Sequence, residues 1–562
     1  MKKELTAERG MILAVVLSGL VLVVSQYFFK PAPSPTATKS GAQQSARPVQ
    51  PDAIQKPEPP VRSASPTGSS LAIKTEAVQA DKEEFVTVET GVYRVVFSNR
   101  GAVVRNWILT QYRDHEGKPL ELVNQKALAT VPAPFSLAFR SQAPSSDPNG
   151  ALFHAERSPD GLEISFEFSA GGVHIKKTFH FEKSSYLVGV TSEVAQNGVS
   201  VPHSLMWRGG FGDASTTNPV AVEHAIYYDQ PNSELQVKTA QDAKDAPVGA
   251  SGQFSFVGLE DAYFAAAFLP GERASVEQTT YSDGVPGAKG EAEARVGMGV
   301  GGEGANQLSL FIGPKDTDLL RKVNPKLDQV IDWGWFGVIA KPLFYALNWT
   351  SDRLTHNYGW AIILVTLVIN ILMFPLKLTS MKSAKKMQSV QPKIQAINDR
   401  YKNIPMKDPR QTEKNQEIMD LYKREGINPV GGCLPLLIQM PFLLAFYKVL
   451  SVAIEMRGAH WFWVADLSQP ETLAIKVLPI LLIVTQFIST KMTPSPGMDP
   501  AQQKMMLVMP LVLGYMFYFT SSGLVLYWLT GNVVAIAQQW LLNRFMPTPV
   551  VSPAKASSNK KK

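Results

Sequence analysis

The sequence predicts a polytopic α-helical membrane protein with one N-terminal anchor span, a large all-β domain outside the membrane and a core of five further spans. Three observations predict this architecture. Several stretches of the 562-residue chain run for about 20 residues without a charge, which is the length that crosses a hydrocarbon core of about 30 Å. Residues 83–320 instead alternate polar and apolar side chains, and basic residues gather on one side of the predicted membrane.

The N-terminal part is predicted to be an anchor followed by a tether. Residues 11–29 are apolar and lack a clear small-residue cleavage site, which favours an uncleaved anchor within residues 1–30 over a removed signal peptide. Residues 31–82 are rich in Pro, Ser, Ala and Thr. Such a composition buries too little apolar surface to order the backbone, so we expect a disordered tether.

Residues 83–320 are predicted to form a β domain. Period-two alternation recurs at 93–97, 164–168 and 173–179, and Gly, Asn and Asp separate the runs. This pattern, with its β-branched and aromatic residues, is typical of antiparallel strands, and many such strands favour a sandwich of two sheets. The single cysteine, Cys433, excludes an intramolecular disulfide, so the domain must be stabilised by its own core.

An interfacial helix and five spans are predicted after the β domain. Residues 331–349 are rich in aromatic side chains and interrupted by Gly and Pro342, which favours an amphipathic helix in the membrane interface. The alternative is that they begin the next span. The five expected spans are 358–376, 431–453, 474–490, 505–520 and 523–542.

Charge orients these spans. The segment 377–428 carries twelve Lys and Arg, and the tail from Arg544 carries five with no acidic residue, whereas the segment 454–473 carries only Arg457. Since cytoplasmic segments are enriched in basic residues, both termini and 377–428 are predicted to be cytoplasmic. Residues 31–357 then lie outside.

No enzyme class is indicated. All eight histidines lie on the outer side of the predicted membrane, and no zinc, P-loop, dinucleotide-binding or nucleophile-elbow motif occurs. The centres of the spans hold no Asp or Glu, so the proton relay of a pump is missing as well. We expect no catalytic residue, no metal site and no cofactor.

The predicted spans contain uncharged polar side chains, which are costly in hydrocarbon unless they meet partners or water. Two interpretations stay open. The side chains join helices through hydrogen bonds worth about 0.6 kcal/mol each, or they line a hydrated cavity. The candidates are Thr366, Asn370, Gln439, Gln486, Tyr527, Trp528 and Asn532.

Residues 377–428 are predicted to form a charged helical hairpin, with apolar side chains at helical spacing on both sides of a break near 403–409. In the simpler interpretation the two helices pack on each other and leave a solvated basic face. In the other, pliable methionines and their neighbours receive apolar segments of other proteins. The side chains concerned include Met381, Met387, Ile394 and Ile397.

The stretch 426–441 reads Gly-Ile-Asn-Pro-Val-Gly-Gly-Cys-Leu-Pro-Leu-Leu-Ile-Gln-Met-Pro, and it resembles the signature of the YidC/Oxa/Alb family of membrane protein insertases. The stretches 391–395, 509–510 and 522–527 agree with this resemblance. The match is specific over about 330–545. Over 31–320 it is only architectural, and there the chain is similar to the Gram-negative form with a large periplasmic domain.

The resemblance implies a fold and a function. It implies that a five-helix insertase core, residues 350–545, encloses a hydrophilic groove open to cytoplasm and lipid. The protein would insert nascent inner-membrane proteins and help them fold, alone or with the Sec translocon. The hairpin would receive the substrate, and the periplasmic domain would be a β-supersandwich largely dispensable for insertion.

The resemblance also implies partners and a location. The protein would reside in the cell inner membrane among lipids, without sequence-specific nucleic-acid binding. The ribosome is an expected partner, contacted by the basic tail of residues 546–562 through Lys555, Lys560, Lys561 and Lys562.

The sequence departs from the family pattern at the groove. The family usually has one positive residue there, four residues after a threonine on the second span, and alignment puts Asn370 at that position after Thr366. We therefore expect a neutral groove that favours short exported tails with few charges. Trp528 likewise follows Tyr527 where the family often has a second tyrosine.

Two other functions remain as alternatives at this point. One is a membrane-anchored enzyme or sugar-binding protein that acts through the β domain, and loss of insertion after deletion of 83–320 would favour it. The other is a small-solute transporter, against which the missing intramembrane charges and repeat symmetry weigh.

Overall fold

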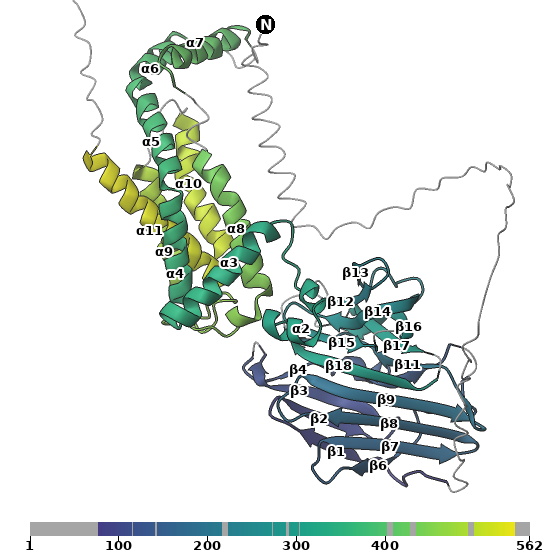
Figure 1. Cartoon of the computed structure of the whole chain (residues 1–562). Coiled ribbons are helices and arrows are strands. Elements are labelled where there is room, and N and C mark those ends of the chain that lie inside the picture. The colour runs from purple at the N-terminus through teal and green to yellow at the C-terminus, as the bar shows by residue number, and fades with distance from the viewer. Residues whose placement is uncertain are drawn as a thin grey trace, which may run out of the picture.

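The computed structural model describes residues 77–114, 116–140, 143–215, 223–271, 274–287, 291–302, 304–401, 408–427, 434–492 and 500–545. The predicted first span, most of the tether, Cys433 and the basic tail lie outside these residues. The described residues form a β domain and a helical bundle, and the short helices α2 (Thr317–Val323) and η3 (Leu327–Val330) follow the last strand on the way to the bundle (Figure 1).

The β domain contains two antiparallel sheets. The smaller sheet has four strands, β1 (Phe85–Glu89), β2 (Tyr93–Ser98), β3 (Val103–Arg113) and β4 (Pro119–Glu121), and the short helix η1 (Ala127–Ala129) follows it. The larger sheet comprises β5 (Ser136–Ala138), β6 (His154–Arg157), β7 (Glu163–Ala170), β8 (Val173–Phe181), β9 (Leu187–Gln196), β10 (Val199–Ser200), β11 (His203–Trp207), β12 (His224–Asp229), β13 (Glu234–Lys238), β14 (Val248–Glu260), β15 (Phe264–Leu269), β16 (Ser275–Pro286), β17 (Ala292–Gly302) and β18 (Asn306–Pro314).

Strand β14 connects the two halves of the larger sheet. Its first part, 248–253, pairs with β16, whereas its last part, 257–260, pairs with β15. The order β5-β11-β17-β16-β14-β15-β18-β9-β8-β7-β6 then runs from one half to the other. The predicted multi-stranded β domain is therefore present, and its sheets enclose one apolar core.

Strand β8 shows why the alternating pattern folds this way. Every second residue from Val173 to Phe181 is buried, as the period-two spacing predicts. One buried position carries Lys177, whose Nζ donates to the carbonyl oxygens of Gly101 at 2.7 Å, Ala102 at 3.2 Å and Phe135 at 2.8 Å. The ammonium group is tolerated in the core because all three of its N–H groups have acceptors.

The helical part begins with α3 (Gly337–Thr350), the π-helical turn η4 (Ser351–Thr355) and α4 (Tyr358–Leu372). It continues through α5 (Phe374–Ser389), α6 (Gln391–Arg400), α7 (Arg410–Arg424), α8 (Leu434–Val452), η6 (Ile454–Met456), α9 (Val477–Met492), α10 (Pro500–Phe517) and α11 (Ser522–Phe545). Helices α4 and α8 lie within two of the five segments predicted as spans after the β domain, and α9, α10 and α11 overlap the other three but extend beyond them.

The residues at the helix starts fit their positions. The Asn357 side-chain oxygen accepts from the backbone N–H groups of Gly359 and Trp360 and so caps α4. Helix α5 follows α4 almost directly, because only Met373 separates them, and Pro375 sits in the first turn of α5, where its missing N–H is tolerated. The segment predicted as a hairpin thus starts within α5, which continues α4 after a single residue.

Within the described residues, no single helix combines the length and the hydropathy of a complete membrane span. One pair passes that test together, Gly337–Thr355 with Tyr358–Leu372, and it bends by 115° at its break. Three shorter apolar helices are Gln439–Val452, Val477–Met492 and Met505–Phe517.

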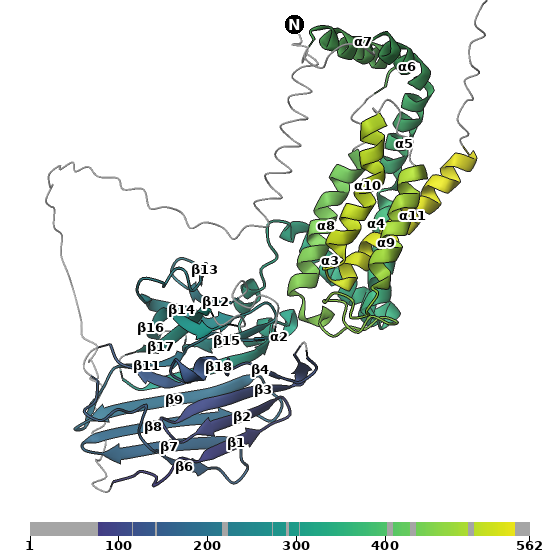
Figure 2. The ribbon, with the colours of Figure 1, turned by 180° about the vertical axis from the view of Figure 1, so that it is seen from behind.

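Figures 1 and 2 show α4, α8, α9, α10 and α11 side by side in a bundle, with the β domain at one end and α6 and α7 at the other. The bundle and the β domain share buried surface. Phe256 and Phe311 of the β domain belong to the same apolar cluster as Phe344 of α3 and Phe446 of α8. The two parts of the molecule are therefore packed against each other.

A buried ion pair lies at this junction. Arg457, just after η6, pairs with Asp213 of the β domain, and its guanidinium also donates to the Arg113 carbonyl oxygen at 2.9 Å. It lies 5.3 Å from the ring centre of Tyr263, whose hydroxyl donates to the Leu450 carbonyl oxygen of α8 at 3.4 Å. These contacts attach the loop after α8 to the β domain.

Candidate functional site

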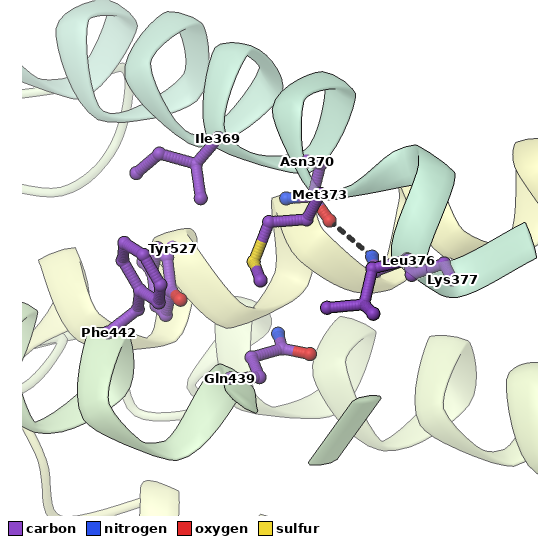
Figure 3. Close-up of a pocket in the computed structure, with 8 residues that line it drawn as sticks. All are labelled: Ile369, Asn370, Met373, Leu376, Lys377, Gln439, Phe442 and Tyr527. Carbon is purple, nitrogen blue, oxygen red and sulfur yellow. Dashed lines mark hydrogen bonds between the residues drawn. The ribbon is translucent and has the colours of Figure 1, made fainter. Parts of the chain in front are cut away.

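A pocket lies between α4, the start of α5, α8 and α11 (Figure 3). Its cavity volume is about 20 Å³, and it is partly open to solvent. Its wall is largely apolar, with an amide from each of α4 and α8, one lysine and one phenol. The lining residues are Ile369, Asn370, Met373, Leu376, Lys377, Gln439, Phe442 and Tyr527.

Asn370 is held firmly in this pocket. Its Nδ2 donates to the Thr366 carbonyl oxygen at 2.8 Å, and its Oδ1 accepts from Lys377 Nζ at 2.6 Å, the bond drawn as a dashed line in Figure 3. The side chain is almost completely buried. Both ends of the amide are thus satisfied by protein groups, and its orientation is fixed.

Lys377 corrects the expectation of a neutral groove. It was counted among the twelve basic residues of the predicted cytoplasmic segment, yet its ammonium lies in the pocket against Asn370. The sequence contains a signal for this position, because Lys377 follows Asn370 by seven residues. Residues seven apart in a helix lie two turns apart on nearly the same face. Among the described residues, Lys377 forms no ion pair, so its charge faces only neutral partners.

Gln439 and Tyr527 complete the polar part of the wall. Tyr527 is fixed by stacking on Phe446 of α8, with ring centres 4.0 Å apart and planes 24° apart. A Cβ added to Gly531 of α11 would lie 3.6 Å from Gln439 Nε2, so α11 passes close to that amide. Three of the seven predicted candidates, Asn370, Gln439 and Tyr527, are therefore brought together in one pocket.

The other four candidates are not among the residues that line the pocket, and their side chains form hydrogen bonds within or between helices. The Thr366 hydroxyl is fully buried and donates to the Ile362 carbonyl oxygen of its own helix at 2.6 Å. Trp528 Nε1 donates to Gln486 Oε1 at 3.3 Å, and Asn532 Nδ2 donates to Thr485 Oγ1 at 3.4 Å. These last two bonds join α9 to α11. The candidates thus divide into residues that join helices and residues that line the pocket.

Gln538 was missed by the sequence analysis. Its Nε2 donates to the Asn370 carbonyl oxygen at 3.5 Å from α11, and its buried Oε1 has no partner among the described residues. From the sequence alone, an amide near the C-terminal end of α11 cannot be told from the polar residues that end an ordinary helix. Only the packing of α11 on α4 reveals that it adds polarity behind the pocket.

The far end of the bundle is closed by the loop between α8 and α9. Ser522 and Gly523, at the start of α11, donate their backbone N–H groups to the carbonyl oxygens of Gln469 at 2.7 Å and Leu467 at 2.8 Å. Glu471 accepts from the backbone N–H groups of Val477 and Leu478 and so caps α9. Fixed loop backbone therefore covers the helix ends on the β-domain side.

The hairpin helices pack on each other. Val390, Ile394 and Ile427 form a small buried cluster, against which Met387, Ile418, Leu421 and Tyr422 pack. Ile394 is 1% exposed and Ile397 is 5% exposed, so both face the hairpin interior. The geometry agrees with the simpler interpretation for these residues, while the side chain of Met381 lies outside the described ones.

No group of three or more His, Cys, Asp or Glu side chains that could hold a metal ion occurs in the described part of the chain. The pocket instead offers hydrogen-bond donors and acceptors, one cation and an apolar wall.

Comparison with known proteins covers both parts of the chain. Residues 85–346 match the family model "YidC periplasmic domain", and residues 349–549 match the model "60Kd inner membrane protein". A membrane protein insertase YidC from Ralstonia nicotianae is 35% identical over 508 residues, which cover 87% of this chain and 89% of that protein. One from Pelobacter propionicus is 34% identical over 564 residues, which cover 96% of this chain and 99% of that protein.

A solved structure is also similar. The crystal structure of an active YidC insertase with its first transmembrane domain resolved is 21% identical and aligns over 82% of this chain and 93% of that chain, with a TM-score of 0.35.

Proposed function

The chain belongs to the YidC family of membrane protein insertases, and we propose that it inserts nascent inner-membrane proteins through the pocket between α4, α8 and α11. It is an inner-membrane protein with a periplasmic domain, and it is not an enzyme. Cooperation with the Sec translocon and with the ribosome, the latter through Lys555 and Lys560–Lys562, forms part of the proposal.

The proposed topology has the hairpin in the cytoplasm and the β domain in the periplasm. Its support is that α6 and α7 lie at one end of the bundle and the β domain at the other (Figure 2). The basic residues concentrate at the hairpin end, in agreement with the charge rule for cytoplasmic segments. The loop that covers the helix ends on the β-domain side favours a groove that is closed toward the periplasm.

In the proposed mechanism the pocket lowers the cost of moving polar chain into the membrane. Transfer of a backbone amide from water to an apolar environment without a new hydrogen-bond partner costs roughly 2–7 kcal/mol. Asn370, Lys377 and Gln439 offer partners to a short exported segment as it leaves water. The pocket wall and its polar groups are the observation that carries the proposal.

The apolar segment of the substrate then moves into lipid. Transfer of apolar surface from water to lipid contributes about 25 cal/mol per Å². The transfer of a whole span therefore drives insertion without a nucleotide. The outer surface of α10 presents exposed apolar side chains, as a lipid-facing helix should. They include Leu507, Val508, Leu511 and Val512.

Substitution of Asn370 tests the proposed groove. Asn370→Leu removes the amide and leaves Lys377 without its acceptor, so we expect insertion of a short single-span substrate into proteoliposomes to fall about fivefold, the factor equivalent to a hydrogen bond of about 1 kcal/mol. Asn370→Arg places a second cation beside Lys377 and should also lower insertion, because like charges repel. Asn370→Gln keeps an amide and serves as the matched control. Full activity of Asn370→Leu would show that polarity at this site is not needed.

A further inference from the structure

We propose that the turn of residues 461–464, here called the aromatic turn, is a membrane-docking surface that inserts into the lipid headgroup region on the β-domain side of the bilayer. Its partner is the lipid itself. The proposal rests on the structure of the turn and on the membrane location of the family. It does not depend on insertion of substrates through the pocket.

The backbone of the aromatic turn is the first argument. Trp461 and Val464 exchange both of their backbone hydrogen bonds, at 2.9 Å and 2.8 Å, so only two residues close the turn. One of these two, Phe462, has a φ of 46°, in the left-handed region that favours Gly and Asn. The fold therefore keeps a large apolar ring at a position where a smaller residue would cost less free energy. Strained backbone of this kind is typical of functional positions.

The exposure of the rings is the second argument. Phe462 is 68% exposed and Trp463 is 41% exposed, and the two rings are nearly parallel. Trp463 Nε1 donates to Glu471 Oε1 at 2.7 Å, so the one polar group of this ring already has a partner. Trp461 is buried against Gly359 at the start of α4, which fixes the turn to the bundle. The turn thus presents fixed apolar rings on its outer side, as aromatic side chains do at a membrane interface.

Continuity with the outer face of α4 is the third argument. The ring centre of Trp360, which is half-exposed, lies 5.6 Å from that of Phe462. Leu367 and Ile371 are exposed on nearly the same face of α4 as Trp360, and this apolar stripe faces lipid in a membrane protein. From Trp360 to Ile371 the stripe rises about 16 Å, roughly half of a hydrocarbon core. The aromatic turn continues the stripe at the β-domain end, where hydrocarbon gives way to headgroups.

The helix geometry and the local charges agree with this depth. Helix α3 meets α4 at a bend of 115°, and the break lies just before Trp360, so α4 begins at the level of the turn. Between Arg457 and Asp466 the chain carries no Lys, Arg, Asp or Glu. Arg457 is itself buried in its ion pair with Asp213. Insertion of the aromatic turn into the interface therefore removes no charged side chain of residues 458–465 from water.

A depth measurement with a spin label tests the proposal in the full-length chain. Cys433→Ser removes the single cysteine, and Phe462→Cys then supplies one labelling site. In zwitterionic lipid vesicles without another protein, collisions of the label with oxygen, which concentrates in hydrocarbon, are compared with collisions with a water-soluble nickel chelate. We expect the oxygen-to-nickel ratio at 462 to exceed by about threefold the ratio for Val199→Cys, whose native side chain in the β domain is equally exposed at 68%. Ile371→Cys, farther along the stripe, should give a higher ratio still.

The collision rates also identify other occupants of the surface. A ratio at 462 equal to that at 199 would place the aromatic turn in water and overturn the proposal. Low collision rates with both reagents would show that protein, such as a second copy of this chain, covers the turn, and they would overturn it as well. Trp360→Cys examines the same group of rings from α4 and should give a ratio close to that at 462. A ratio at 360 equal to that at 199 would contradict the proposal independently of how Phe462→Cys folds.

Discussion

At the scale of single residues, the junction between the two parts of the molecule changes the pKa of Glu455. Burial raises the pKa of this carboxyl group to about 7, and the carboxylates of Asp316, Asp318 and Asp352 act in the same direction. Glu455 lies in η6, directly after α8, in the loop that contacts the β domain. Near neutral pH it is therefore partly protonated, unlike an ordinary surface glutamate.

The stability of the protein should depend on this proton. The folded state holds it more tightly than the unfolded chain, so the stabilisation is complete below about pH 4.5 and is lost as the pH rises through about 7. We expect the melting temperature in detergent to fall between pH 5 and 8, with a change of about 2–3 kcal/mol from this group. Glu455→Gln should flatten that dependence. A pH profile that is identical in wild type and variant would contradict the assignment.

At the scale of elements, α11 contacts α9 and α8 through polar side chains, with different consequences. Toward α9 it forms the bonds of Trp528 with Gln486 and of Asn532 with Thr485. Toward α8 it contributes Tyr527 to the pocket that Gln439 also lines. The first set joins helices, and the second set leaves polar groups facing the pocket.

Two matched substitutions distinguish these sets. Gln439→Leu removes a pocket amide and should lower insertion about fivefold, as expected for a lost hydrogen bond of about 1 kcal/mol. Gln486→Leu makes the same chemical change between α9 and α11, and it should lower stability by only about 0.6 kcal/mol and keep insertion within about twofold of wild type. Insertion assays and thermal unfolding measure both effects. Equal losses of insertion in the two variants would show that the pocket amide of Gln439 matters no more for insertion than the amide of Gln486 between α9 and α11.

At the scale of the whole molecule, side chains of the loop after α8 add to the apolar contacts that hold the β domain and the bundle together. Ile454 belongs to the core cluster of the β domain, and Arg457 pairs with Asp213 in a position where both side chains are almost fully buried. Tyr263 adds its hydrogen bond to α8. The resemblance to insertases implied a β domain that is largely dispensable, yet these contacts give it a fixed position on the loop between α8 and α9.

Removal of Arg457 should loosen this junction. Arg457→Ala removes the cation from the buried ion pair with Asp213, and breaking a buried pair costs about 3–5 kcal/mol. We expect a lower melting temperature and faster protease cleavage between the two parts of the chain. Arg321→Ala is the matched control, because its ion pair with Asp328 is partly exposed and should contribute no more than about 1 kcal/mol. Similar effects of both variants would argue against a specific contact at Arg457.

Much of the fold was predictable because its signals are local. The alternation at 173–179 is the burial pattern of β8, and helices occupy all five of the apolar segments predicted as spans after the β domain. The motif at 426–441 indicated the family, which the family models and the relatives confirm. Thr366 and Asn370 were also correctly expected to share a helix face, since spacing along a helix fixes direction.

The site was only partly predictable. Gln439 and Gln486 have the same side chain, but Gln439 lines the pocket and Gln486 accepts a hydrogen bond from Trp528. No local sequence pattern distinguishes the two positions. The groove was expected to be neutral because position 370 holds Asn, yet Lys377 brings a charge to the same place from the next helix. The sequence by itself determined the β domain, the apolar helices and the family, because these depend on periodicity and composition. Only the tertiary structure decided which polar groups meet, because side-chain contacts depend on how helices distant in sequence pack together.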